Sequence, residues 1–238
     1  PRRQMAAADR HLNHPHRLSL RPLAGAPGVT KATDRRTAAT RAALIECAEM
    51  LFAEHGVDGV SLRQIATASG SANTNVVAYH FGSKEALVEA VIHHRLPGFE
   101  QRRAELAAAA PEGDLVALCD ALWRPFLEQV NAAGRHSYAG FLAGLMRSNQ
   151  LAVRAAMSGN YPVTQALFDR IAATQPHVLA RRLASRVSLL TMLIASALQL
   201  SDENALSATD AEAQFADTVA MAAAALAAPF LQPESPTS

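Results

Sequence analysis

The stretch SLRQIATASGSANTNVVAYHFGSKEAL, residues 61–87, contains the expected starts of three helices and two glycines within a short span. Ser61 stands three residues before Gln64, which is the spacing of a capping box at the beginning of a helix. We expect this helix to stop before Gly70, because glycine readily adopts the left-handed conformation of a turn. Another short helix is expected to begin near Asn73. The stretch therefore predicts two short helices joined by a polar turn.

Longer helical patterns flank this pair on both sides. From Asp34 onward, apolar residues recur with the period of one helix face, and Gly56 supplies the expected C-cap. On the other side, Ser83 is placed to cap a helix that we expect to run to about Leu96. Pro97 and the glycine after it are expected to break that helix and to act as a hinge. The two short helices are thus predicted to lie between two longer ones.

Two short helices joined through a glycine turn, with a longer helix in front, form a helix-turn-helix unit. In such a unit the second helix lies in the DNA major groove and presents its N-terminal residues to base edges. Val77 and Phe81 are expected on the inner face of that helix. The outward residues predicted to contact bases are Asn73, Thr74, Asn75 and Ala78, and those predicted to meet phosphates are Tyr79, His80 and Lys84. The alternative is a plain helical hairpin with a polar exposed face.

The segment AALIECAEMLFAEHGVDGVSLRQIATASGSANTNVVAYHFGSKEALVEAVI (residues 42–92) resembles the DNA-binding domain of TetR-type transcriptional regulators. The residues that carry the resemblance are Ala48, Leu51, Phe52, Gly56, Ser61, Ile65, Ala66, Gly70, Tyr79, His80, Phe81, Ser83, Lys84 and Leu87. Contacts to the DNA backbone that the resemblance implies come from Ser61, Arg63 and either Thr37 or Arg41. The spacing from Gly70 to Phe81 is one residue longer than is usual in the family, so the base-contacting register stays open by one residue.

The rest of the chain, residues 97–232, shows alanine-rich helical patterns without the alternation that marks β-strands. The predicted fold class is therefore all-α, with a helix-turn-helix DNA-binding domain over residues 34–96. The resemblance implies that residues 97–232 form a helical bundle for effector binding and dimerisation. Residues 1–33 and 233–238 are expected to be disordered tails. Residues 1–41 carry nine Arg or Lys against two Asp, which favours an anionic partner such as double-stranded DNA.

The resemblance also implies a homodimer that binds a palindromic operator and leaves it when an effector binds. Candidate residues for a pocket suited to a small hydrophobic or aromatic effector are Trp123, Phe126, Tyr138, Phe141, Leu145, Met146, Met157, Tyr161, Phe168, Met192 and Gln199. Candidate residues for the dimer interface, taken from stripes on the last two helices, are Leu183, Val187, Leu190, Ile194, Leu198, Phe215, Val219 and Leu226. Packing within one subunit is the alternative for both sets.

Other functional classes find little support in the sequence. No Glu-x-x-His, HExxH, GxSxG, Walker-loop or SxxK motif occurs, so no enzymatic activity, metal or cofactor is predicted. The most apolar run, residues 187–200, is too short for a bilayer span, and no membrane association is expected. Cys47 and Cys119 make no disulfide framework, which is typical of a reducing, cytoplasmic compartment. A ligand-independent architectural DNA-binding protein and an activator of the same fold remain as alternatives.

Overall fold

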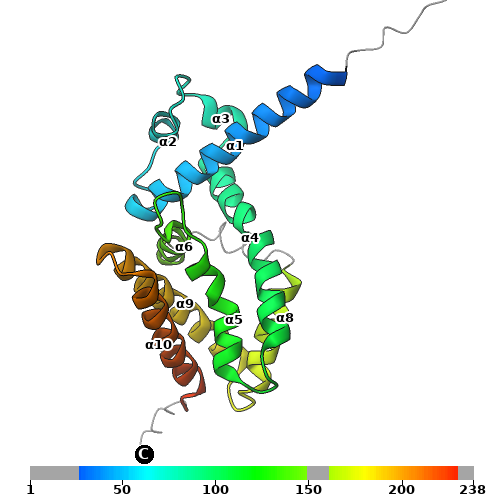
Figure 1. Ribbon diagram of the computed structural model, residues 1–238, viewed down its shortest axis with the longest axis vertical. Helices are drawn as coiled ribbons and strands as arrows, with labels where there is room; N and C mark the ends of the chain where they lie inside the picture. Colours follow the sequence, from blue (N-terminus) through cyan, green and yellow to red (C-terminus); the bar gives the residue numbers. More distant parts are fainter. Residues whose placement is uncertain (1–26, 149–160, 230–238) are drawn as a thin grey trace, which may run out of the picture. The chain divides into compact units, whose positions relative to one another are not determined.

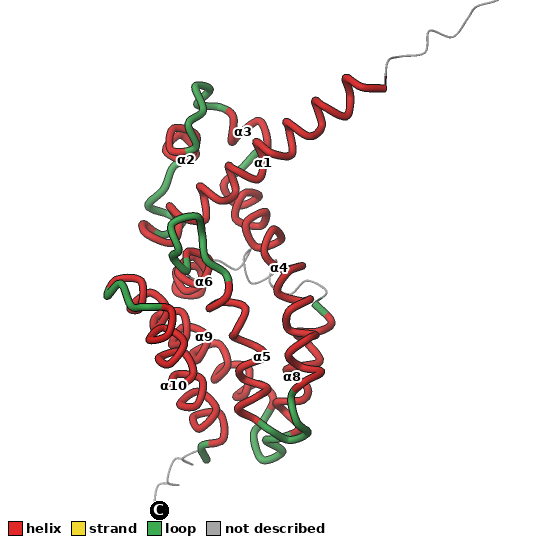
Figure 2. Tube along the Cα trace, viewed as in Figure 1, coloured by secondary structure: helices red, strands yellow, loops and turns green. Residues whose placement is uncertain are grey.

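The computed structural model describes residues 27–148 and 161–229, and within these ranges the chain is helical without β-strands, as predicted (Figure 2). The helices are α1 (Pro27–His55), α2 (Leu62–Ala68), α3 (Val76–Phe81), α4 (Lys84–Ala109), α5 (Leu115–Glu128), α6 (Ser137–Arg147), α8 (Pro162–Ala173), α9 (Ala180–Glu203) and α10 (Ala208–Ala227). The chain divides into two compact units, residues 1–37 and 38–238. All the packing described below lies within the second unit.

The first helix begins earlier than the sequence pattern predicted. α1 begins at Pro27, whereas we expected a disordered tail as far as residue 33 and a helix from Asp34. Proline suits the first turn of a helix, because its missing N–H would have no intrahelical partner there. Between these two positions only Gly28 strongly disfavours a helix. The pattern marked where the apolar face starts, which is later than where the helix itself starts.

The two short helices form as the local signals predicted. Gln64 N–H donates to Ser61 Oγ at 3.3 Å, and Ser61 N–H donates to the Gln64 side-chain oxygen at 2.7 Å, which completes the capping box. Gly70 has a φ of +77° where the chain turns away from α2. α3 begins after Asn75 rather than near Asn73. The reason is a local turn in which Asn73 Oδ1 accepts a hydrogen bond from Asn75 N–H at 3.0 Å.

α4 is continuous where the sequence predicted a break. It runs through Pro97 and Gly98, so neither residue forms a hinge between two helices. Proline in a helix interior removes one backbone hydrogen bond. However, Ile92 before it and Phe99 after it are both buried in the same hydrophobic core. Burial of this face offsets the missing bond, and the predicted domain boundary therefore falls inside a helix.

The helices that follow the helix-turn-helix form a second domain, which is a bundle built around α4 and α9. Beyond the helix-turn-helix, α4 packs against α5 and α8, while α9 packs against α6 and α10, as Figure 1 shows. The largest fully buried side chains include Trp123 of α5, Phe141 of α6 and Phe215 of α10. Gly134 and Pro176 lie in loops between these helices. The core of this domain therefore includes large aromatic side chains and is shared by helices distant in sequence.

α9 and α10 bury the stripes that we predicted for a dimer interface. The eight residues, each at most 8% exposed in the single chain, are Leu183, Val187, Leu190, Ile194, Leu198, Phe215, Val219 and Leu226. The chain's own helices already cover this most regular apolar stripe, which favours the alternative of packing within one subunit. By length and composition α9 could also cross a membrane, with a mean hydropathy of 1.5. The core helix of a protein that does not enter a membrane meets the same criteria of length and composition, and 44% of the 18-residue apolar window of α9 is buried.

Candidate DNA-binding surface and effector pocket

The turn before α3 and the outer face of α3 form a polar, exposed surface. The four residues predicted to contact bases are all exposed, namely Asn73, Thr74, Asn75 and Ala78. Tyr79 is 83% exposed, whereas Val77 is fully buried against the core. The Asn75 side-chain amide makes no hydrogen bond within the described residues, so its donor and acceptor are available. An amide presented in this way can pair with the edge of an adenine.

The residues predicted to contact the DNA backbone differ in whether their side chains already bond to other parts of the chain. Ser61 and Arg63 are exposed at the start of α2. Arg41 instead donates from Nη1 to the His80 carbonyl at 2.8 Å, and its guanidinium carbon lies 4.1 Å from the centre of the Phe81 ring. Arg41 therefore holds α1 to α3, in addition to any contact with phosphate. Arg63 is the more accessible cation.

Lys84 also has a role within the chain. Its Nζ donates to the Val57 carbonyl at 3.0 Å and so fixes the start of α4 to the loop after α1. Because lysine has three N–H donors, two remain for a phosphate. His80 is half-buried, with its ring centre 5.1 Å from that of Tyr79 in an edge-on arrangement. Thr37 is exposed but belongs to the first compact unit.

Residues 44–91 match the model of a family described as bacterial regulatory proteins, tetR family. Residues 44–91 thus have the sequence of a tetR-family segment. The HTH-type transcriptional repressor NicS of Pseudomonas putida is 35% identical over 86 residues, which are 35% of this chain and 40% of that protein. The HTH-type transcriptional repressor Rv3405c of Mycobacterium tuberculosis is 44% identical over 68 residues, 26% of this chain and 36% of that protein. The match thus spans less than half the length of these curated relatives.

A solved structure extends the likeness beyond the helix-turn-helix. The crystal structure described as a tetR family transcription regulator from Shewanella sp. PV-4 superposes with a TM-score of 0.52. The superposition covers 76% of this chain and 97% of that chain, at 20% sequence identity. At this identity the likeness shows a shared fold alone. The shared fold therefore includes the helical second domain as well as the matched segment.

The second domain contains a cavity of about 150 Å³ lined by α4, α5, α6, α8 and α9. The residues that line it are Ile92, Leu96, Phe99, Arg103, Leu122, Trp123, Phe126, Tyr138, Leu142, Tyr161, Thr164, Phe168 and Thr191. The predicted pocket residues among them are Trp123, Phe126, Tyr138, Tyr161 and Phe168. Rings from four elements thus converge on one small space, as in most ligand pockets.

The other predicted pocket residues lie elsewhere. Phe141 stacks on Phe52 of α1, with ring centres 6.0 Å apart, and does not line the cavity. Three more that do not line it are Leu145, Met146 and Met192. Gln199 lines a separate cleft, and Met157 lies outside the described residues. Aromatic composition alone could not tell which face of each helix is turned toward the cavity.

The contribution of α4 to the cavity was missed. Ile92, Leu96, Phe99 and Arg103 recur at helical spacing along one face of α4 and line the cavity together. The same spacing is visible in the sequence, but the expected break at Pro97 interrupted it. Reading the helix through the proline would have identified all four.

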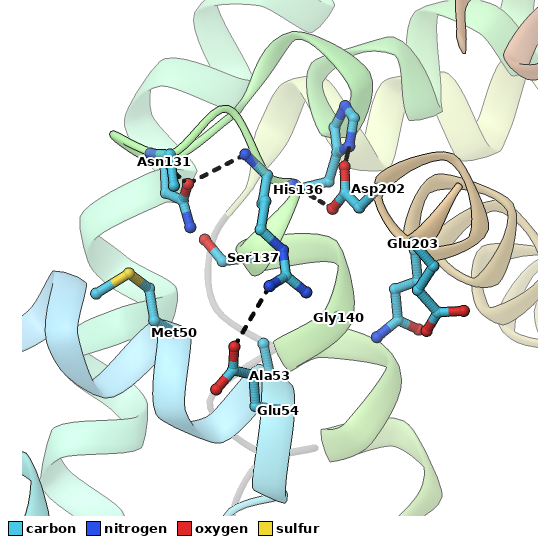
Figure 3. Close-up of a pocket in the computed structure, with 12 residues that line it drawn as sticks. Met50, Ala53, Glu54, Asn131, His136, Ser137, Gly140, Asp202 and Glu203 are labelled. Atoms are coloured by element: carbon cyan, nitrogen blue, oxygen red, sulfur yellow. Dashed lines mark hydrogen bonds and ion pairs between the residues drawn. The ribbon is translucent and has the colours of Figure 1, made fainter. Parts of the chain in front are cut away.

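Figure 3 shows the separate cleft, which is more polar and has a volume of about 350 Å³. His136 Nδ1 lies 2.7 Å from Asp202 Oδ1, and the His136 backbone N–H donates to Asp202 Oδ2 at 2.8 Å. Its Nε2 lies 3.1 Å from the Leu127 carbonyl. Arg135 pairs with Glu54 at 3.5 Å. These polar groups bond to one another, so the cleft is a structural junction of the α5–α6 loop with α1 and α9.

A buried carboxylate joins three helices beside this junction. Glu49 of α1 is 1% exposed and accepts hydrogen bonds from Arg95 Nε at 2.7 Å and Arg95 Nη2 at 3.2 Å. It also accepts one from Ser137 Oγ at 2.6 Å. Arg95 lies on α4, and Ser137 begins α6 directly before Tyr138, which lines the cavity. The cavity wall is thus connected to both long helices that support the helix-turn-helix.

The described residues contain no group of three or more His, Cys, Asp or Glu side chains suited to a metal ion. Cys47 and Cys119 are both buried and unpaired. Burial raises the pKa of both thiols, that of Cys119 to about 12. Neither thiol is therefore activated as a nucleophile at neutral pH.

Proposed function

We propose that the protein is a sequence-specific, DNA-binding transcriptional regulator that acts as a ligand-released repressor in the cytoplasm. The observation that carries this proposal is the free amide of Asn75, exposed at the N-cap of a short helix whose inner residue Val77 is fully buried. The match of residues 44–91 to the tetR family supports DNA binding, and the names of both curated relatives support a repressor over an activator. The cavity in the second domain supplies a place for the ligand.

The regulator acts as a homodimer whose subunits meet through the outer faces of α9 and α10. Leu189, Leu193 and Leu200 of α9 are 62%, 39% and 51% exposed, and Met221 of α10 is 55% exposed. These two helices pack against each other, so their exposed side chains belong to neighbouring surfaces. A two-fold axis through such a surface would repeat it on both subunits. The paired α3 helices would then meet major grooves about 34–36 Å apart.

Effector binding acts through α4. Ile92, Leu96 and Phe99 bring this helix to the cavity wall, and Lys84 at its start is bonded to the Val57 carbonyl beside the helix-turn-helix. A ligand that fits only one position of α4 shifts the spacing of the two recognition helices. Differential binding of about 1–3 kcal/mol between the two positions suffices for a typical allosteric response.

Selection of bound duplexes from a random DNA pool by the purified full chain tests the proposal. A palindrome with half-sites one helical turn apart is expected. Asn75→Ala should then weaken binding to that palindrome by about 1–3 kcal/mol and leave non-specific binding unchanged. The matched control, Arg63→Ala, should weaken binding to every duplex and reduce the salt slope by about one. An architectural protein would yield no palindrome and would bind all duplexes alike, which would reject the proposal.

The dimer is tested separately by sedimentation. Leu193→Glu places a charge on the exposed face of α9 and is expected to give monomers that no longer bind the palindrome cooperatively. Val116→Glu is the control, because Val116 is 48% exposed on α5 and is not among the α9 and α10 residues of the proposed face. A Leu193 variant that stays as dimeric as the Val116 variant would place the interface elsewhere.

A further inference from the structure

One charged side chain in the cavity is buried without a direct ion pair. Arg103 of α4 is 6% exposed. Its Nε donates to the Leu122 carbonyl at 3.0 Å, and its Nη1 donates to Thr164 Oγ1 at 2.9 Å. Its Nη2 has no hydrogen bond within the described residues, nor does the guanidinium form an ion pair with any carboxylate of those residues. A buried cation is costly unless an anion neutralises it.

The nearest carboxylate is already engaged. Glu100 Oε2 accepts from Val163 N–H at 2.9 Å, and Glu100 Oε1 accepts from Thr164 N–H at 3.1 Å and from the Thr164 hydroxyl. Glu100 is thus bonded to the first turn of α8 and reaches Arg103 only through the Thr164 hydroxyl. Burial lowers the pKa of Arg103 to about 10, so the guanidinium remains protonated at neutral pH.

The walls around Arg103 are aromatic. The Phe99 and Phe126 rings have centres 5.3 Å apart and lie 5.5 Å and 5.8 Å from the Arg103 guanidinium carbon. Tyr138 meets Phe99 edge-on at 5.1 Å, and its hydroxyl has no hydrogen bond within the described residues. The volume of about 150 Å³ is close to that of an apolar cavity known to hold benzene, of about 150 Å³. The space therefore fits a single ring.

We propose that this cavity binds a one-ring aromatic carboxylate, with its carboxylate on Arg103 Nη2 and its ring among Phe99, Trp123 and Phe126. This inference rests on the proposed function, since it names the chemical class of the effector that releases the regulator. Arginine and carboxylate form charge-assisted hydrogen bonds of well-matched geometry. The binding of such an anion would give the guanidinium the direct carboxylate partner that the described residues do not provide.

The surroundings favour a singly charged acid over a phosphate ester. Arg103 is the only cation among the described residues that line the cavity, and the carboxylate of Glu100 lies beyond Thr164. A second negative charge would have no cation of its own and would be repelled by Glu100. A neutral aromatic molecule would fill the space but would leave Arg103 without a counter-charge.

Trp123 is the only tryptophan of the chain and lines the cavity, so its fluorescence reports binding directly. The full chain is titrated with benzoate, 4-hydroxybenzoate and phenylacetate, and with benzamide and benzyl alcohol as neutral molecules of similar shape. At least one of the acids is expected to bind about tenfold more tightly than either neutral molecule, because only the acids form charge-assisted bonds. Equal binding of acids and neutral molecules, or no binding by any acid, overturns the proposal. This comparison of ligands uses the unmodified protein, so its outcome does not depend on whether a variant folds.

Two variants assign the effect to the guanidinium. Arg103→Met should lose at least about tenfold of the acid's affinity while keeping its weaker affinity for benzyl alcohol. Retained affinity for benzyl alcohol also shows that this variant has kept the folded cavity. Arg102→Met is the matched control, because Arg102 pairs with Glu105 and Glu128 on the surface and should leave acid binding unchanged. Undiminished acid binding by the Arg103 variant would refute the assignment.

DNA binding is measured on the same preparations, so that the two proposals can fail independently. A palindrome-binding protein that binds none of the acids would overturn the ligand class and leave the regulator intact. Acid binding by a protein without sequence-specific DNA binding would do the reverse. If both proposals hold, saturating acid should release the palindrome from the wild-type protein but not from the Arg103→Met variant.

Discussion

Replacing Glu49 by alanine should destabilise the protein by about 3 kcal/mol, because it removes one partner of a buried ion pair. The carboxylate is 1% exposed and accepts two hydrogen bonds from Arg95 and one from the Ser137 hydroxyl. Loss of one partner from such a pair typically costs about 3–5 kcal/mol. The Arg95 side chain is 14% exposed and can recover some hydration, which places the expected loss at the lower end of that range.

Urea unfolding followed by Trp123 fluorescence measures this loss, at one fixed protein concentration because dimerisation would add to the apparent stability. Glu46→Ala is the matched control, since Glu46 is exposed one turn earlier on α1 and should change the free energy by less than about 0.5 kcal/mol. The double variant Glu49→Met, Arg95→Met should regain most of the loss, because it leaves no unpaired charge. If Glu49→Ala were no more costly than Glu46→Ala, the junction of α1, α4 and α6 would not depend on this carboxylate.

Three further outcomes are expected. Ser61→Ala should cost about 1 kcal/mol in urea unfolding, because it removes the capping box with Gln64; an unchanged midpoint would contradict that role. Gly98→Ala should stabilise the protein by about 0.5–1 kcal/mol, because an added Cβ meets nothing within 4 Å on a continuous helix; destabilisation would argue against that continuity. Cys119 should resist iodoacetamide at pH 8 until the protein unfolds, because burial raises its pKa to about 12. Because the folded protein holds the Cys119 thiol proton more tightly than the unfolded chain does, the free energy of unfolding should also fall as pH rises above about 9.

The helix-turn-helix could be predicted from the sequence because its signals are local. The Ser61 and Gln64 side chains bond to backbone only three residues away, and Gly70 sets a turn by itself. Burial of Val77 follows from the same helical spacing. The exact start of α3 was less accessible, because the turn at Asn73 competes with the helix for the same backbone groups. These local signals therefore predicted that the helices form more accurately than they predicted the residue at which each helix begins.

The second domain could be predicted only in outline, because its important contacts join distant residues. Pro97 is a strong local signal for a break, yet tertiary packing of Phe99 overrides it. Likewise, the apolar stripe of α9 is regular whether a second subunit or the same chain covers it. Residues such as Leu189 and Leu193, which the structure leaves exposed, stand outside that stripe on another face of α9. Which apolar residues remain exposed follows from three-dimensional packing and not from periodicity.

α4 carries two largely buried arginines, of which one has a carboxylate partner and the other has none among the described residues. Arg95 lies against the carboxylate of Glu49, so its charge is neutralised where it joins helices. Arg103 has a carbonyl, a hydroxyl and two ring faces around it, but no carboxylate of the described residues pairs with it. For stability alone, an apolar side chain would serve at least as well as an unneutralised guanidinium. An anion that binds from solution explains why a charged side chain stands at this position. Its binding would act on α4, the same helix that Lys84 fixes beside the DNA-binding surface.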